Sequence, residues 1–362
     1  MKRNLNVTLA EEMFLDCARS NNFSIHSDLA LITDDPTLLF TNSTIVAFKT
    51  YISDSKLISP GFAIVQPCLR TQNLRNIRNS SELSYMSYFK QAGVIGDHHS
   101  LDNILNLFDS YFIGNCKVNA ERILFKTSVT LPFNQSMKQA FPDISCVYDT
   151  EGTSFYRWKY GMNEVEGYGL TFSIKNSIDN EYYDVGNIIQ LRQNSTIIGY
   201  EFGFGIETFL SRLYSTDTPF DFAGMKLDFI ENLPILVKNK FTDLATIIAI
   251  LLSLQLKPGR GGRESILRKA LSDFFSFVFT FDICFEDVLH SIVIFLKDRS
   301  LSINNVEQRL AEIYAVQRDK YRLAKEYITY CQRHLKTRDF IIENVSRKYG
   351  FDNYYYSFLF DK

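Results

Sequence analysis

A few side chains in this sequence have the types and spacing needed to bind a phosphorylated ligand. Arg70 ends a β-type run, GFAIVQPCLR at 61–70, and the planar fork of an arginine binds oxyanions through two nitrogens. Gly203 and Gly205 alternate on another apolar run, where the missing Cβ atoms would let a flat ligand lie against the backbone. Arginines at strand ends are more often solvated or paired with a carboxylate, so Arg70 alone is weak support for a site.

Strands and a loop must hold Arg70 in place. Residues 34–48, DDPTLLFTNSTIVAF, begin with an acidic pair and a proline, which suit a strand start, and predict a short strand over 38–40. The polar residues 71–84 predict a loop, and residues 85–93 predict the strand that follows it. Arg70 would then lie at the start of a loop between two strands.

Helical patterns surround these strands. Residues 8–20 predict an amphipathic helix that begins at a threonine cap, and residues 97–112 predict another helix. Residues 197–213 predict a strand that turns directly into a helix near Ile206. From about residue 223 the periodicity is helical, and it includes a long amphipathic helix near the end of the chain.

Composition narrows the possible functions. The 362 residues are 46% apolar, which allows a substantial core, and the net charge of −2 gives no overall attraction to nucleic acid. The six cysteines lack metal-ligand or disulfide spacing, so we expect no metal site and a reduced, cytoplasmic setting. The longest apolar run, at 244–256, is too short to span a bilayer, so we expect no membrane role.

Several strings together resemble a known family. DPTLLFTN, AFK and VQPCLR are similar to the start of the catalytic domain of alanyl-tRNA synthetases, which are class II synthetases, and the resemblance reaches about residue 335. It implies an α+β fold, with an antiparallel class II sheet flanked by helices and followed by an all-helical domain. The implied domains are 1–222 (catalytic), 223–335 (helical, binding the tRNA acceptor stem) and 336–362 (a C-terminal tail). The family's editing and oligomerisation domains are not expected here.

The resemblance also implies a binding site for ATP with Mg²⁺. Arg70 would hold the α-phosphate, Phe89 would stack on adenine, and Gly203 and Gly205 would form the floor under the nucleotide. Simple core packing is the alternative role for Phe89, because the chain has 31 phenylalanines.

Three further residues would bind the amino acid. Glu201 falls where the family has an aspartate that holds the substrate α-amino group, and Asn187 matches a family asparagine at the pocket. Trp158 lies in residues 155–174, which resemble the pocket lining, although MNEVEGYG replaces the family's Gly-Pro-Cys repeat. Trp158 would either form a wall of the pocket or fill the core.

One position departs from the family in a way that affects catalysis. Thr208 stands where the family has an arginine that contacts the γ-phosphate, and removing such a charged group costs about 3 kcal/mol of transition-state stabilisation. Lys90, in place of a family glutamate near the ATP loop, could compensate for the missing charge.

The segment LKPGRGGRESILRKAL, at 256–271, resembles the part of the helical domain that handles the acceptor stem. Its basic residues lie in a Gly-rich loop and a helix start, where side chains and free N–H groups can bind phosphate oxygens. These residues are Lys257, Arg260, Arg263, Arg268 and Lys269. A solvated helix start is the alternative interpretation. The implied partners are tRNA and an amino acid rather than DNA.

Three functions remain open from the sequence. The first is an enzyme that activates an amino acid with ATP and transfers it to a tRNA 3′ end, as a specialised paralogue of alanyl-tRNA synthetase. The second is a pseudo-synthetase that binds RNA or regulates, in which Thr208 marks lost catalysis. The third is an adenylating ligase that transfers the amino acid to a small molecule or carrier.

Overall fold

The computed structural model describes residues 5–27, 30–33, 35, 38–128, 134–148, 156–160, 162, 164–216 and 218–350. The chain divides into two compact units. The first consists of Met1–Leu69 and Phe89–Phe222, and the second consists of Arg70–Tyr88 and Ala223–Lys362. The protein belongs to the α+β class, with a large sheet and helices of up to 28 residues.

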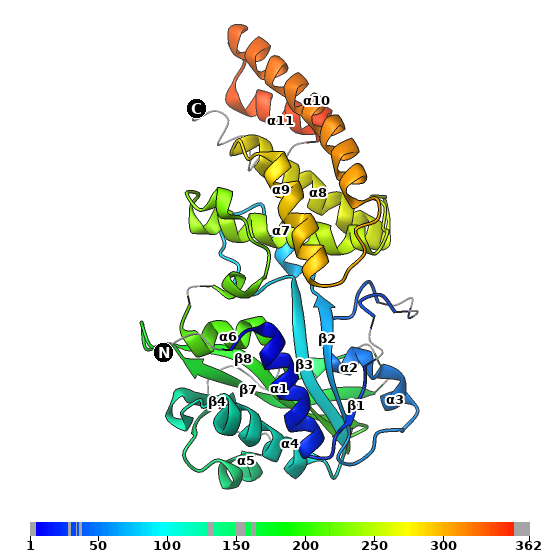
Figure 1. Cartoon of the computed structure of the whole chain (residues 1–362), viewed down its shortest axis with the longest axis vertical. Helices are drawn as coiled ribbons and strands as arrows, with labels where there is room; N and C mark the ends of the chain where they lie inside the picture. The colour runs from blue at the N-terminus through cyan, green and yellow to red at the C-terminus, as the bar shows by residue number, and fades with distance from the viewer. Residues whose placement is uncertain are drawn as a thin grey trace. The chain divides into compact units, whose positions relative to one another are not determined.

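The described residues contain nine strands in one mixed sheet (Figure 1). The strand order is β1-β2-β3-β9-β8-β7-β4-β5, and β6 pairs with β7. The pairs β3/β9, β9/β8, β8/β7, β7/β4 and β7/β6 are antiparallel, whereas β1/β2 and β4/β5 are parallel. The expected antiparallel sheet is therefore mixed, because a short strand at each edge runs parallel to its neighbour. The strands are β1 Ser24–Ile25, β2 Phe62–Leu69, β3 Tyr88–Asp97, β4 Ile123–Thr127, β5 Ser145–Tyr148, β6 Arg157–Lys159, β7 Val165–Lys175, β8 Tyr182–Gln193 and β9 Thr196–Gly205.

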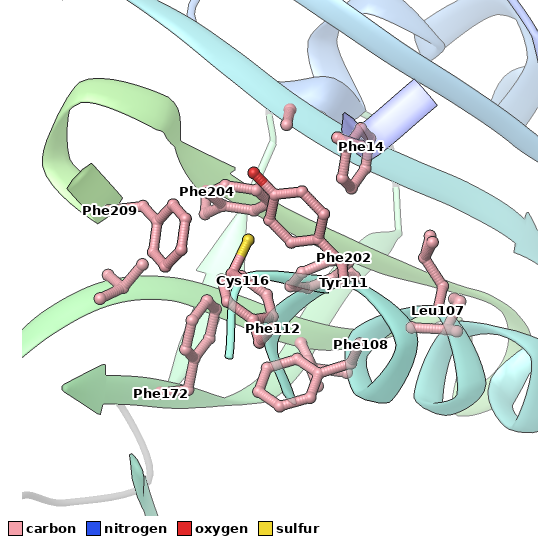
Figure 2. Close-up of a cluster of buried hydrophobic side chains, with 14 of the residues drawn as sticks. Phe14, Leu107, Phe108, Tyr111, Phe112, Cys116, Phe172, Phe202, Phe204 and Phe209 are labelled. Atoms are coloured by element: carbon pink, nitrogen blue, oxygen red, sulfur yellow. The ribbon is translucent and has the colours of Figure 1, made fainter. Parts of the chain in front are cut away.

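One face of the sheet packs against an aromatic core that we call the aromatic cluster. Figure 2 shows Phe14, Tyr111 and Phe112 near Phe202 and Phe204 of β9. The Phe14 and Tyr111 rings are 5.4 Å apart in an edge-on geometry, and the Phe112 and Phe204 rings are 5.1 Å apart. The covering elements are α1 Val7–Ser20, α4 Leu101–Phe108, the π-helical turn Asp109–Asn115, α5 Asn134–Ala140 and α6 Ile206–Tyr214.

The opposite face packs against a smaller apolar group that we call the aliphatic cluster. Ile64, Ile95 and Ile189 belong to it, whereas Ile188, the neighbour of Ile189, belongs to the aromatic cluster. This division follows from the alternation of side chains along a strand. Two short helices, α2 Thr44–Ala47 and α3 Lys49–Ser53, together with the residue between them, contribute Ile45, Phe48 and Ile52 to the aliphatic cluster.

The second unit consists of helices and the segment Arg70–Tyr88. Aromatic stacking joins its helices: the rings of Phe241 and Phe274 are 5.0 Å apart, and those of Phe285 and Tyr314 are 4.1 Å apart. The helices are α7 Ile235–Ser253, α8 Gly262–Thr280, α9 Phe285–Asp298, α10 Val306–Arg333 and α11 Arg338–Tyr349. The end of the chain, residues 351–362, lies outside the described residues.

Three local expectations were wrong. Leu38–Phe40 is not a strand, because the chain bends there before Ser43 caps α2. The first helix is capped by Asn6, whose side chain accepts a hydrogen bond from Leu9 N, and not by a threonine. The helix expected from residue 97 begins only at Leu101, because β3 extends to Asp97. Residues 34, 36 and 37, part of the stretch that was expected to mark the start of this strand, lie outside the described residues.

Candidate functional site

Small and polar residues form one row across four strands of the first unit. Gly93, Gly203, Asn187 and Thr171 are successive cross-strand partners on β3, β9, β8 and β7. Cross-strand partners direct their side chains to the same face of a sheet, so the row shares one face. Thr171 Oγ1 donates a hydrogen bond to Asn187 Oδ1 at 2.9 Å. Asn187 is half-buried and already has a protein partner. The two glycines have no Cβ, and side chains of other residues occupy that space.

Polar atoms gather over Gly203. Glu201 Oε1 lies 2.7 Å from the point that a Cβ on Gly203 would occupy, and Gln91 Nε2 and Thr44 Oγ1 lie 3.0 and 3.2 Å from that point. Glu201 and Gly203 share a face because they are two residues apart on β9. Glu201 is only 4% exposed, so its carboxylate acts in a largely dry environment, where charge interactions are strong.

The Thr44 side chain can lie close to Gly203 because the residue of β3 that it packs against, Gly93, is a glycine. Thr44 Oγ1 lies 2.2 Å from the point that a Cβ on Gly93 would occupy, which is closer than real Cβ contacts come. Ser43 fixes the start of α2, since its Oγ accepts from Val46 N at 3.3 Å. Among the described residues Thr44 Oγ1 has no hydrogen-bond partner, although the side chain is fully buried.

Gln66 and Tyr160 of the first unit also carry buried polar atoms without partners among the described residues. These atoms are the amide nitrogen and oxygen of Gln66, on β2, and the hydroxyl of Tyr160. Cys68 Sγ, two residues after Gln66, donates to Gln91 Oε1 at 3.3 Å. Buried polar groups are normally paired, and each unpaired one costs about 1–3 kcal/mol, so this concentration favours a ligand-binding role.

Tyr160 is electrostatically linked to Glu201. Burial is the main cause that raises the pKa of the Tyr160 hydroxyl, and the Glu201 carboxylate raises it further. The hydroxyl is therefore protonated at neutral pH and can donate a hydrogen bond. Gly167 leaves room for it, because a Cβ there would lie 2.2 Å from Tyr160 Oη.

Phe89, which is buried, lies close to Gly205. Phe89 Cδ2 is 3.3 Å from the point that a Cβ on Gly205 would occupy, and Thr208 Oγ1 is 3.4 Å from the same point. Thr208 is buried and neutral, so its side chain brings no positive charge to this end of β9. Lys90 Nζ lies 3.6 Å from Glu11 Oε2, and this ion pair offsets part of the positive charge of Lys90.

Trp158 lies in β6 directly opposite Gly167 of β7. The side chain is half-buried and packs against the aliphatic cluster. It therefore helps to fill the core of the sheet face that carries Glu201. Residues 155, 161 and 163, within the stretch that was expected to line the pocket, lie outside the described residues.

Arg70 follows the last residue of β2, as expected, but belongs to the second compact unit. Its backbone N donates to Ser87 O at 2.9 Å, which closes the base of the segment Arg70–Tyr88. The expected ATP contacts are thus divided: Phe89, Gly203 and Gly205 lie in the first unit, and Arg70 lies in the second.

The basic residues of 257–269 lie around the start of α8. Lys257, Arg260, Arg268 and Lys269 are exposed, and Arg263 is half-buried. Arg268 Nε donates to Gly259 O at 2.9 Å, which ties the glycine-rich loop to the helix. The segment therefore presents a cluster of positive charge at a helix N-terminus, where phosphate groups bind well.

Sequence reasoning missed Thr44, Gln66, Gln91 and Tyr160. Gln66 and Gln91 interrupt apolar strands, and a polar residue in a buried strand is itself a signal that a partner is needed. Thr44 and Tyr160 give no comparable signal, because their burial depends on distant glycines.

No protein-family model matches this chain, and no match was found among curated proteins. Within the described ranges, no helix is long and apolar enough to cross a membrane. The same residues contain no group of three or more His, Cys, Asp or Glu side chains that could hold a metal ion.

Proposed function

We propose that this chain is a class II synthetase related to alanyl-tRNA synthetases that activates an amino acid with ATP and transfers it to a tRNA 3′ end. The observation that carries the proposal is the position of Glu201, buried beside the glycine row with Gln91 and Thr44 close by. A buried carboxylate with a hydroxyl oxygen close by suits the ammonium group of an amino acid, because it supplies the opposite charge in a dry site.

The expected chemistry uses the two glycines and Arg70. A carboxylate oxygen of the amino acid attacks the α-phosphorus of ATP, a new P–O bond forms, and the bond to pyrophosphate breaks. Positive charge from Mg²⁺, which enters with ATP, and from Arg70 would stabilise the negative charge that develops. Phe89, packed beside Gly205, would stack on the base.

The basic segment at α8 supports an RNA acceptor. Most of its basic side chains are exposed around a helix start, so they are accessible to phosphates. The cysteines of the described residues form no disulfide. A cytoplasmic setting agrees with these free cysteines and with an RNA partner for the basic segment.

The second candidate function is a catalytically impaired RNA-binding protein. It is favoured by one observation, the neutral and buried Thr208 beside Gly205. Transfer of the amino acid to a small molecule or carrier is a third candidate, and the basic segment at α8 argues against it.

Amino-acid-dependent ATP–pyrophosphate exchange, run across the common amino acids and several small non-protein ones, tests the proposal. Exchange with one amino acid would support activation and identify the substrate, and Arg70→Ala and Glu201→Gln should abolish that exchange without unfolding the protein. Silence of the wild type across the panel, with tRNA also added, would favour the RNA-binding protein.

A further inference from the structure

The segment Arg70–Tyr88 is held by a buried carboxylate of its own unit. Asp243 of α7 accepts two hydrogen bonds from Ser87, from N to Oδ1 at 2.7 Å and from Oγ to Oδ2 at 2.6 Å. Asn73 Nδ2 lies 3.4 Å from the same Oδ2. Asp243 is 1% exposed, so water does not compete strongly for these contacts.

Two other buried charges hold the middle of the segment. Asp273 of α8 accepts from Arg78 Nε at 2.8 Å, and Lys240 Nζ donates to Asn79 O. Asp273 is 2% exposed and Lys240 is fully buried. Lys240 and Asp243 are three residues apart and share one face of α7. The segment is thus fixed to α7 and α8 at its middle and at its end.

Ser87 transmits this constraint to the first residue of the segment. Its carbonyl oxygen accepts from Arg70 N at 2.9 Å, while its N–H and hydroxyl bind Asp243. Asn73 also donates to Tyr85 O at 2.5 Å, which links the two limbs of the segment. One residue therefore separates the Asp243 carboxylate from the Arg70 backbone.

We propose that Asp243 is a positioning residue for ATP, which fixes the place of Arg70 through Ser87. The inference rests on the proposed role of Arg70 in holding the nucleotide. A carboxylate inside an apolar helix is unfavourable unless donors surround it, and Ser87 and Asn73 supply those donors. An error of about 1 Å in the position of a catalytic group lowers rates about 100-fold, so a loosened segment would impair catalysis.

The test compares three α7 variants in ATP–pyrophosphate exchange. Asp243→Ala removes both acceptors and is expected to lower kcat/KM for ATP about 10- to 100-fold, with little change in the KM for the amino acid. Asp243→Asn retains an acceptor for Ser87 N and a donor for Ser87 Oγ, and should restore most of the activity. Thr246→Ala is the matched control, because Thr246 is buried one turn along α7 and its hydroxyl binds Thr242 O within that helix.

Hydrogen exchange of the Arg70–Tyr88 amides gives a readout that does not depend on turnover. Asp243→Ala, and to a smaller extent Ser87→Ala, should increase exchange in this segment, whereas Thr246→Ala should not. Three results would overturn this inference and leave the proposed function standing. They are wild-type amide protection in Asp243→Ala, an unaltered kcat/KM for ATP in Asp243→Ala, or a loss of kcat/KM in Asp243→Asn as large as that in Asp243→Ala. A wild-type protein that shows no ATP–pyrophosphate exchange would overturn the proposed function, and with it this role for Asp243.

Discussion

Both carboxylate oxygens of Glu207 accept a hydrogen bond from the backbone N–H of Lys90, at 3.1 and 3.0 Å. Gln91 and Gly205 are the last partners of the β3/β9 ladder, and α6 begins directly after Gly205. The Glu207 side chain therefore supplies the acceptor that β9 no longer provides. This interaction fixes the start of β3 at Lys90, the residue after Phe89. We place the nucleotide at this end of the sheet.

Replacing Glu207 tests that interaction. Glu207→Ala leaves the Lys90 N–H without this acceptor and should lower the free energy of unfolding by about 1–3 kcal/mol. Glu207→Gln retains a carbonyl acceptor and should lose less. Urea denaturation measures both variants, and equal losses in the two would contradict the role of the hydrogen bond.

Gly203→Ala should selectively disturb amino-acid binding. The new Cβ would lie 2.7 Å from Glu201 Oε1 and 3.0 Å from Gln91 Nε2, so both side chains must move. We expect the KM for the amino acid to rise about tenfold, because losing a charge-assisted hydrogen bond costs about 1.5–3 kcal/mol. Gly114→Ala is the control, since its nearest neighbour would be 3.6 Å away. A wild-type KM in Gly203→Ala would argue against this position for the ammonium group.

Tyr160→Phe separates binding from stability. The Tyr160 hydroxyl is buried without a partner among the described residues, so its removal should leave the free energy of unfolding unchanged or raise it. If the hydroxyl contacts the substrate, the same change should raise the KM for the amino acid. Thermal unfolding and exchange kinetics on one preparation give both quantities. Destabilisation with an unchanged KM would make Tyr160 a purely structural residue.

The stability of the second unit should depend on pH through Asp243. Burial is the main cause that raises the pKa of Asp243 from 3.8 to about 6, so the folded state binds a proton more readily than the unfolded state. The protonated Asp243 carboxyl therefore stabilises the folded state below pH 3.8. This stabilisation, about 3 kcal/mol, is lost as the pH rises to about 6. Asp243→Asn cannot titrate, so urea denaturation should show its stability rising relative to wild type between about pH 4 and pH 7. A constant difference across that range would contradict the raised pKa.

Charge reversal at Arg260 and Arg263 should weaken tRNA binding and reduce its dependence on salt. For each phosphate that the protein no longer neutralises, the slope of log affinity against log salt becomes shallower by about 0.7 to 0.9. Filter binding across a salt series measures the slope. Reversal at Arg322, an exposed residue paired with Glu326 on α10, is the control. Unchanged affinity and slope would leave the segment as a solvated helix start.

The sequence indicated the elements whose patterns are local. The β9 strand and the helix that follows Gly205 were predicted because the apolar alternation stops where the helical period begins. Arg70 was likewise placed directly after a strand. Leu38–Phe40 was misjudged, because three apolar residues in a row do not determine whether a strand has a partner to pair with.

The candidate site was harder to predict from the sequence, because its geometry depends on glycines whose missing Cβ atoms let distant side chains approach the strands. Thr44 approaches β3 only because residue 93 lacks a Cβ, and no pattern near either residue indicates the pairing. Asp243 offers a usable signal, since a single acidic residue directly precedes the apolar run of α7. Its donor Ser87, however, lies 156 positions earlier in the chain.

The single tryptophan gives the protein a built-in optical probe. Trp158 is the only residue of its type in the chain, and it packs on the sheet face that carries Glu201. Selective excitation of its indole would therefore follow the first unit alone, against a background of tyrosines distributed through both. Tryptophan emission would then report on the first unit, whereas helical circular dichroism would report on both units, with the larger share from the helices of the second. The separation or coincidence of the two unfolding curves would measure how strongly the two units cooperate.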